Sequence, residues 1–322
     1  MKILICPLNW GLGHATRCVP IISRYLADGH EVQIAADGYP LEFLKQAFPA
    51  LKTIELPSYQ VKYSKHKTQI FAMLQNIPYI MYGVANEYKK LHQILTNEHF
   101  DLVISDNRFG LHVKKNHSNV RTIYITHQIM VKMPNGLKIF EPLVAKIHKK
   151  FIEKFDECWI PDVAENGGYA GDLSHKYKLP HNAKYIGLLS RFSNITVDKI
   201  ESPFKIVAVL SGLEPHRTML EHKLIEKFRK SPHPALIVYG QPRPERREYT
   251  IGNVTLMSHL PHGTLAAYLQ SAEHIICRSG YSTIMDLIEL NCIHKAEFIP
   301  TPGQTEQEYL CDYWLKKRVV EK

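Results

Sequence analysis

Two side chains with acid–base chemistry follow apolar runs in the first half of the sequence. His14 stands in GLGHATR, directly after the run MKILICPL, and Asp106 ends the run DLVISD. An imidazole at such a place can take a proton from a hydroxyl group, and a neighbouring carboxylate would orient the ring and stabilise its protonated form. We therefore predict His14 as a general base and Asp106 as its partner. The alternatives are a loop histidine bonded to backbone and an aspartate that caps a turn.

The same half offers further candidates for binding the substrate that carries this hydroxyl group, which we call the acceptor. Gly11 and Gly13 allow a close approach of the backbone to a ligand, and His127 ends the apolar run of VRTIYITHQ. We predict these three residues at the acceptor site, with a structural role for His127 as the alternative. GLGHATR lacks the last glycine of a dinucleotide-binding fingerprint. Asp37 lies near the end of the second predicted strand, where that fingerprint has an acidic residue, so a nicotinamide or flavin site stays an alternative.

Small and hydroxyl-bearing residues follow apolar runs in the second half as well. In LSGLEPHRT, Ser211, Gly212 and Arg217 are suited to a diphosphate, or to an ordinary turn. In CRSGYSTIMDLIEL, Ser279 and Gly280 precede a predicted helix whose first N–H groups suit phosphate.

Carboxylate and amide groups follow these two loops. Asp286 lies six residues after Gly280 and can accept the hydroxyls of a ribose, or else belongs to a solvated helix face. Gln307 and Glu308 open the last predicted helix and are placed to bind a sugar, or to cap that helix.

A metal site is not predicted. The sequence has no D-x-D motif, so no clustered carboxylates are expected to hold a hard cation on a diphosphate. Six cysteines are scattered without a C-x-x-C spacing, which is typical of buried thiols rather than of zinc ligands. We expect no cofactor beyond the substrate itself.

Predicted strands and helices alternate through both halves, which indicates α/β architecture with doubly wound parallel sheets. In the first half we expect strands at 1–8, 31–36, 51–57, 101–106 and 120–128, helices at 18–26 and 40–48, and a long helical pattern after Tyr59 that is broken at Pro78. In the second half we expect strands at 204–212, 235–240, 254–261, 274–280 and 296–300, and helices at 220–228, 265–272, 281–290 and 304–318.

The two halves predict two Rossmann-like domains that face a central cleft. We place a first domain at 1–192, a polar linker at 193–202 and a second domain at 203–322; the family resemblance given below implies that the first binds an acceptor and the second a nucleotide-sugar. The net charge of +9 suits phosphorylated ligands or an anionic membrane surface, and no nucleic-acid motif occurs. No apolar run is long enough to span a membrane, and Gly and His interrupt the N-terminal run, so a cytoplasmic location is expected.

At these residues the chain resembles a known family. CRSGYSTIMD followed by PTPGQTEQEY looks like the donor-binding signature of the MurG-like glycosyltransferases, and GLGHATR resembles their N-terminal glycine loop. The namesake of this family adds N-acetylglucosamine to the lipid-linked peptidoglycan precursor. The resemblance implies the GT-B fold and an inverting transfer from a UDP-sugar to a hydroxyl acceptor.

The resemblance also implies roles for single residues. Ser279, Gly280 and Ser282 would lie near the diphosphate, Ser211 and Gly212 in a second phosphate loop, and Asp286 on the ribose. His259, Leu260 and Leu265 would frame the uracil, and Gln307 and Glu308 would meet the sugar. His14 with Asp106 matches the catalytic histidine and its carboxylate partner in the wider superfamily of such transferases.

Some positions depart from this family. Leu213, Glu214 and Pro215 interrupt the phosphate loop, and Arg17 replaces a region that usually holds proline, so the lipid-precursor acceptor is not carried over. The chain ends soon after Trp314, so we expect that the closing helices of a GT-B enzyme are missing or that this protein is shorter than its relatives.

The acceptor is left with two alternatives. A lipid-linked acceptor on the inner face of the plasma membrane is indicated by lysines beside apolar residues, and a soluble acceptor fits if these lysines form a solvated face. The residues are Lys62, Lys65 and Lys67 before Ile70, Phe71, Met73 and Leu74, and Lys146, Lys149, Lys150 and Lys154 around Phe151 and Ile152. Rival functions on the same fold are an epimerase or hydrolase of nucleotide-sugars and a non-catalytic subunit that binds them.

Overall fold

The computed structural model describes residues 1–58, 69–113, 119–134, 136–193, 195–212, 214–242 and 245–320, and within these ranges it leaves the side chains of 69–77 and 318–320 undescribed. The chain divides into two compact units. The first unit comprises Met1–Asn9 and Ile21–Leu188, and the second comprises Trp10–Pro20 and Leu189–Lys322. The glycine loop with His14 and the predicted linker at 193–202 thus both belong to the second unit.

A seven-stranded sheet forms the centre of the first unit, in the order β3-β2-β1-β4-β5-β6-β7. Every neighbouring pair in this sheet is parallel. The strands are β1 (Lys2–Pro7), β2 (Glu31–Ala36), β3 (Thr53–Glu55), β4 (Leu102–Asp106), β5 (Arg121–Ile125), β6 (Glu157–Ile160) and β7 (Ala183–Tyr185). The short strand β7 lies in a stretch that the sequence pattern presents as loop.

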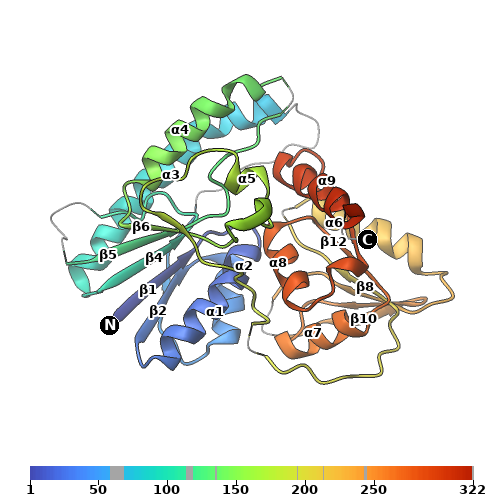
Figure 1. Cartoon of the computed structure of the whole chain (residues 1–322). Helices are drawn as coiled ribbons and strands as arrows, with labels where there is room; N and C mark the ends of the chain where they lie inside the picture. The colour runs from blue at the N-terminus through green and yellow to red at the C-terminus, as the bar shows by residue number, and fades with distance from the viewer. Residues whose placement is uncertain are drawn as a thin grey trace. The chain divides into compact units, whose positions relative to one another are not determined.

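Helices cover both faces of this sheet, as alternating strands and helices require. Helices α1 and α2 lie on one face and α3 and α4 on the other (Figure 1). The helices are α1 (Gly13–Ala27), α2 (Gly38–Ala47), α3 (Gln69–Asn97), α4 (Glu141–Ile152) and the short α5 (Asp172–His175), with single turns η2 (Lys138–Phe140) and η3 (Glu165–Gly167).

The predicted break at Pro78 is wrong. Helix α3 is assigned as one helix of 29 residues that includes Pro78. A proline inside a helix removes one backbone hydrogen bond and strains one turn, but it need not end a long helix that packs on a core. Leu91 of α3 is fully buried in the same hydrophobic cluster as Phe100 and Val103, and this packing holds the helix beyond the proline.

A six-stranded sheet forms the centre of the second unit, in the order β10-β11-β9-β8-β12-β13. It is parallel except for the hairpin of β10 with β11. The strands are β8 (Ile206–Val209), β9 (Ala235–Val238), β10 (Glu248–Ile251), β11 (Val254–Met257), β12 (His274–Cys277) and β13 (Ala296–Phe298). The helices are α6 (His216–Phe228), α7 (His262–Ser271), α8 (Tyr281–Glu289) and α9 (Thr305–Val320), with a single turn η4 (Ile293–Lys295).

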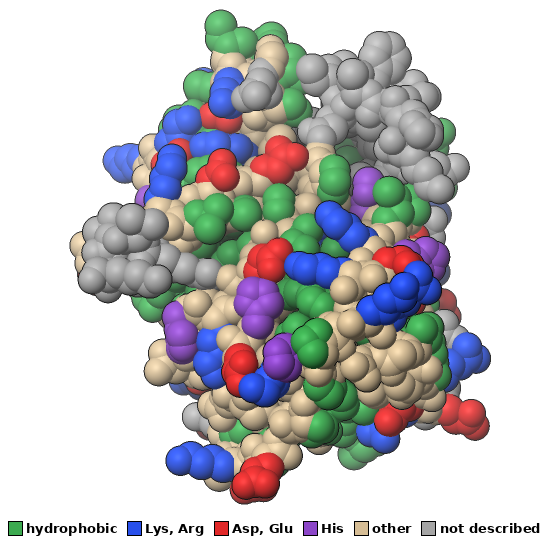
Figure 2. Space-filling view, turned by 90° about the vertical axis from the view of Figure 1, so that its right-hand side faces the viewer, with side chains coloured by type: hydrophobic (Ala, Val, Ile, Leu, Met, Phe, Trp, Pro, Cys, Tyr) green, Lys and Arg blue, Asp and Glu red, His purple; other side chains and the backbone are tan. Residues whose placement is uncertain are grey.

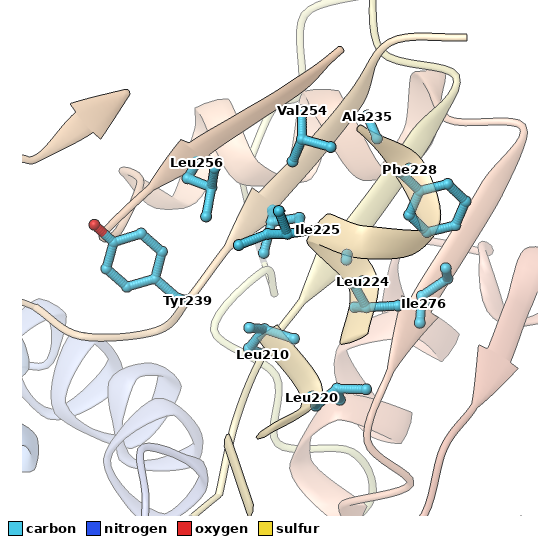
Figure 3. Packing of buried hydrophobic residues seen from close by; sticks show 12 residues of the cluster. Leu210, Leu220, Leu224, Ile225, Phe228, Ala235, Tyr239, Val254, Leu256 and Ile276 are labelled. Carbon is cyan, nitrogen blue, oxygen red and sulfur yellow. The ribbon is translucent and has the colours of Figure 1, made fainter. Parts of the chain in front are cut away.

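One hydrophobic cluster of the second unit lies between α6 and the sheet. Leu220, Leu224 and Phe228 of α6 pack against Ala235 and Ile276 from the strands (Figure 3). Strands buried on both faces read as continuous apolar runs, which is why their positions follow from the sequence. Strand β10 is exposed at all four residues and lacks this signal.

Candidate functional site

Three loops meet at the carboxyl edge of the second sheet, where ligands of open α/β sheets bind. Strands β8, β12 and β13 are neighbours, and their following residues are Leu210–Gly212, Arg278–Gly280 and Ile299–Thr301. Helix α8 begins after Gly280 and α6 after Pro215, and neither N-cap side chain bonds to the helix. In the first turn of α6, Glu214 Oε2 accepts a hydrogen bond from the N–H of Thr218 at 3.2 Å, while the glycine before α8 has no side chain that could cap that helix.

Gln307 joins two of these loops. Its Oε1 accepts a hydrogen bond from the N–H of Thr301 at 2.8 Å, and its Nε2 donates to Gln304 Oε1 at 2.6 Å. The hydroxyl of Ser279, which is fully buried, donates to the carbonyl of Gln307 at 2.7 Å. The side chain predicted to meet the sugar is thus bonded at both ends of its amide, and its sugar contact stays a prediction.

Asp286 is buried and bonded rather than solvated. It is 4% exposed, Ser190 Oγ donates to its Oδ1 at 2.7 Å, and Arg191 Nε donates to its Oδ2 at 3.0 Å. Burial raises the pKa of Asp286, against the charge of Arg191 and the bond from Ser190. The solvated helix face is excluded, while the ribose contact stays a prediction that relies on the acceptor capacity that each carboxylate oxygen retains.

Arg217 is paired with carboxylates inside the second unit. Its Nε lies 2.7 Å from Glu214 Oε1 and its NH1 lies 2.6 Å from Glu221 Oε2. Arg217 as a whole is 8% exposed. Two carboxylates therefore offset the charge that the sequence assigns to a diphosphate.

The glycine loop packs within the second unit. Ser282 Oγ donates to the carbonyl of Gly13 at 2.9 Å. A Cβ added at Gly13 would lie 2.9 Å from the same Ser282 Oγ. Gly11 has φ +85°, in the left-handed region that glycine tolerates. A larger residue at 13 would therefore push against the Ser282 side chain at the start of α8.

His14 is bonded to Arg17, which is almost fully buried. Nδ1 of His14 lies 3.0 Å from NH2 of Arg17. A guanidinium can only donate, so Nδ1 accepts, and the proton of a neutral His14 lies on Nε2. Asp106 is fully buried at the end of β4 in the first unit, and its pairing with His14 stays a prediction.

The other predicted residues occupy several positions in the two units. His127, after β5, is 7% exposed. Leu260 is buried just before α7 and Leu265 within it, and burial lowers the pKa of His259. Glu308 is exposed, and its Oε1 accepts from the N–H of Gly303 at 2.9 Å.

The sequence did not single out four residues that organise these loops. They are Ser190 and Arg191, which hold Asp286, and Arg278 and Thr301, which are buried in the loops after β12 and β13. Arg278 was readable as a charged residue directly after the apolar run HIIC. The partners of Asp286 lie 95 and 96 residues away in the chain, so no local pattern marks them.

The surface of the first unit corrects the predicted membrane contact. Ile152 is fully buried and cannot reach a lipid, while Ile139 of η2 is 82% exposed, and Leu143 and Ile147 of α4 are 55% and 49% exposed. Lys62, Lys65 and Lys67 lie outside the described residues, and Ile70, Phe71, Met73 and Leu74 belong to the part of α3 whose side chains are not described. Over the face drawn in Figure 2, basic and acidic side chains are interspersed rather than gathered by sign.

Two kinds of feature are absent from the residues that the structure describes. No helix among them is both long and apolar enough to cross a bilayer. Across the same part of the chain, no three His, Cys, Asp or Glu residues are grouped so that they could hold a metal ion. Metal independence stays a prediction.

Comparison with known proteins identifies the architecture and the class of enzyme. Residues 1–146 match the family described as glycosyl transferase family 1. An uncharacterized glycosyltransferase of Methanosarcina acetivorans is 24% identical over 330 aligned positions, which cover 96% of this chain and 82% of that protein.

Solved structures match nearly the whole chain. The glycotransferase of kitacinnamycin superposes with a TM-score of 0.58 at 13% identity, covering 99% of this chain and 92% of that one. S. aureus MnaA, solved with UDP, gives a TM-score of 0.57 at 11% identity, covering 100% and 88%. Two Rossmann-like sheets with this order of elements are the GT-B fold, as the sequence predicts.

Proposed function

We propose that this chain, a glycosyltransferase of GT-B type, takes its sugar from a UDP-sugar bound in the second unit and transfers it with inversion to a hydroxyl acceptor, without a metal ion. The sugar is a hexose or an N-acetylhexosamine. One observation carries the proposal: hydrogen bonds tie the loops after β8, β12 and β13 together beside the N-termini of α6 and α8. Such a place suits the negative charge of a leaving nucleoside diphosphate.

The residues of the donor site take the roles that the MurG-like signature implies. The diphosphate is bound by N–H groups of the two phosphate loops, the ribose by Asp286, the uracil by backbone around Leu260, and the sugar by Gln307 and Glu308. The solved complex of S. aureus MnaA holds UDP, which supports UDP as the first nucleotide to test.

His14 is the proposed base and Asp106 the residue that would orient it. In the structure Nδ1 of His14 accepts a hydrogen bond from Arg17. For Nε2 to take the proton of the acceptor hydroxyl, the neutral ring has to carry its proton on Nδ1, so the bond from Arg17 has to break. Arg17 therefore controls when His14 is a base.

The exposed apolar side chains of η2 and α4 support a lipid-linked acceptor. Ile139, Leu143 and Ile147 project from a segment that also carries Lys138, Lys146, Lys149 and Lys150. Apolar side chains among lysines suit the surface of an anionic bilayer. Flotation with vesicles of phosphatidylglycerol should carry the wild type, and Leu143→Glu should reduce the bound fraction severalfold.

The matched control for this surface is Leu315→Glu. Leu315 belongs to α9 and is 54% exposed, against 55% for Leu143. Equal flotation of both variants and the wild type would show that the apolar side chains of α4 do not bind membranes, and a soluble acceptor would then be proposed.

A transfer assay tests the proposed function. The protein is incubated with radiolabelled UDP-glucose, UDP-galactose or UDP-N-acetylglucosamine, with EDTA, and with either a membrane lipid extract or a water-soluble extract. We expect label in one extract and loss of transfer in His14→Ala. Consumption of donor without any acceptor would indicate an epimerase or hydrolase instead, and UDP binding without consumption would indicate a non-catalytic subunit.

A further inference from the structure

Arg278 ties the three donor loops together. It follows β12 and is 3% exposed. Its NH1 donates to the carbonyls of Ile299 at 3.1 Å and Pro300 at 2.9 Å, and its NH2 donates to the carbonyl of His216 at 2.8 Å. The acceptors belong to the loop after β13 and to the first residue of α6. One guanidinium therefore sets the spacing of the loops after β8, β12 and β13.

The charge of Arg278 is not offset by the protein. All three of its acceptors are neutral carbonyls, its Nε is buried without a hydrogen-bond partner, and within the described residues it forms no ion pair. A guanidinium stays protonated in a protein, so this is a full positive charge in a desolvated place. Arg217, by contrast, is paired with Glu214 and Glu221.

A hydroxyl in the same loops also lacks a partner. Thr301 directly follows Pro300, which accepts from Arg278, and Thr301 is 2% exposed with its Oγ1 buried and unbonded. A Cβ at Gly212 would lie 3.9 Å from this oxygen, so the hydroxyl faces the phosphate loop after β8. Buried hydroxyls are nearly always satisfied, and an unsatisfied one in the same loop as a carbonyl that binds an uncompensated cation indicates that an anion belongs there.

We propose that Arg278 and Thr301 form the anion-binding part of the donor site. Arg278 is a positioning residue: it aligns the loops, and its charge stabilises the diphosphate from a buried place that water screens poorly. Thr301 donates its hydroxyl to a diphosphate oxygen once the turn at Gly212 shifts to admit the ligand. This inference rests on the proposed function, because it assumes that the donor is a nucleoside diphosphate sugar.

Calorimetry with UDP and with uridine isolates the contribution of the diphosphate. The measured quantity is the ratio of the dissociation constant for uridine to that for UDP. Arg278→Met should lower this ratio about tenfold, which is about 1.4 kcal/mol, and Arg278→Lys should restore most of it because the charge returns. Arg229→Met, an exposed arginine at the end of α6 that pairs with Glu226, should leave the ratio unchanged.

Thr301→Val tests the hydroxyl without removing the charge. It replaces an unbonded hydroxyl by a methyl group of similar volume, so the melting temperature of the free protein should stay the same or rise. The ratio of dissociation constants should fall about threefold or more. If Arg278→Met does not fold, Arg278→Lys and Thr301→Val decide.

A purely structural role predicts another result. The affinities for uridine and UDP would then fall together, and the ratio would stay at the wild-type value in all variants, which overturns the inference. The inference is also overturned if Arg217→Met lowers the ratio and Arg278→Met does not. If the wild type binds no UDP, the proposed function itself fails; if it binds UDP and the ratio never changes, only this inference fails.

Discussion

Replacing Asp286 by asparagine should destabilise the protein before any ligand is added. The substitution keeps the size of the side chain and removes its charge. Asp286 Oδ2 pairs with Arg191 at 3.0 Å, and the two side chains are 6% and 13% exposed. Leaving one partner of a buried ion pair uncompensated costs roughly 3–5 kcal/mol.

The expected loss for Asp286→Asn is smaller than that range. The amide oxygen can still accept the hydrogen bond from Ser190 Oγ, which is 2.7 Å long in the wild type, and Arg191 keeps a little contact with solvent. We expect a loss of about 2–3 kcal/mol in the free energy of unfolding. Urea unfolding at neutral pH, followed by the fluorescence of the buried Trp314 in the same unit, measures it.

Two further variants define what would refute this reasoning. Asp198→Asn, at an exposed position, should change stability by less than about 0.5 kcal/mol. In the double variant Arg191→Met with Asp286→Asn, the losses should not add, because each single change already breaks the pair. An Asp286→Asn protein as stable as the wild type would show that Arg191 does not depend on this carboxylate.

Three other perturbations test separate parts of the structure. Burial lowers the pKa of His148 from 6.5 to about 4. The unfolded chain therefore binds more protons between these pH values, and the free energy of unfolding falls by about 3 kcal/mol as pH drops through that window. His148→Phe should remove this component in urea unfolding at a series of pH values, and an unchanged pH dependence would refute it. Gly13→Ala places a Cβ 2.9 Å from Ser282 Oγ and should cost about 1–3 kcal/mol, part of which Ser282→Ala should restore; a fully stable Gly13→Ala would show that this contact is loose. Arg17→Met removes the guanidinium that donates to Nδ1 of His14, so the neutral ring can carry its proton on Nδ1 and kcat/KM at neutral pH should rise. An unchanged kcat/KM would exclude Arg17 from control of the base.

Much of the fold is readable from the sequence because its strands are buried on both faces. Runs such as LVISD and ALIV are completely buried in the two sheets and lie where the apolar pattern predicts them. Strand β10 is missed because its four exposed residues carry no such run. Pro78 misleads because local chemistry predicts a break where the packing of a long helix preserves continuity.

The candidate site is readable only to the level of its loops. Glycine and serine after apolar runs indicate which loops hold a ligand, since the carboxyl ends of parallel strands share an edge. Which hydrogen-bond partners each charged side chain has depends on residues far apart in the chain. Asp286 is bonded to Ser190, and Arg278 to the carbonyl of His216, and no spacing rule predicts either contact.

Titration of the purified protein with UDP, ADP and GDP by calorimetry, in EDTA, tests the central claim most directly. We predict that UDP binds and that ADP and GDP bind at least tenfold more weakly. Equal affinity for the three nucleotides, or no binding of UDP, would contradict a UDP-sugar site in the second unit.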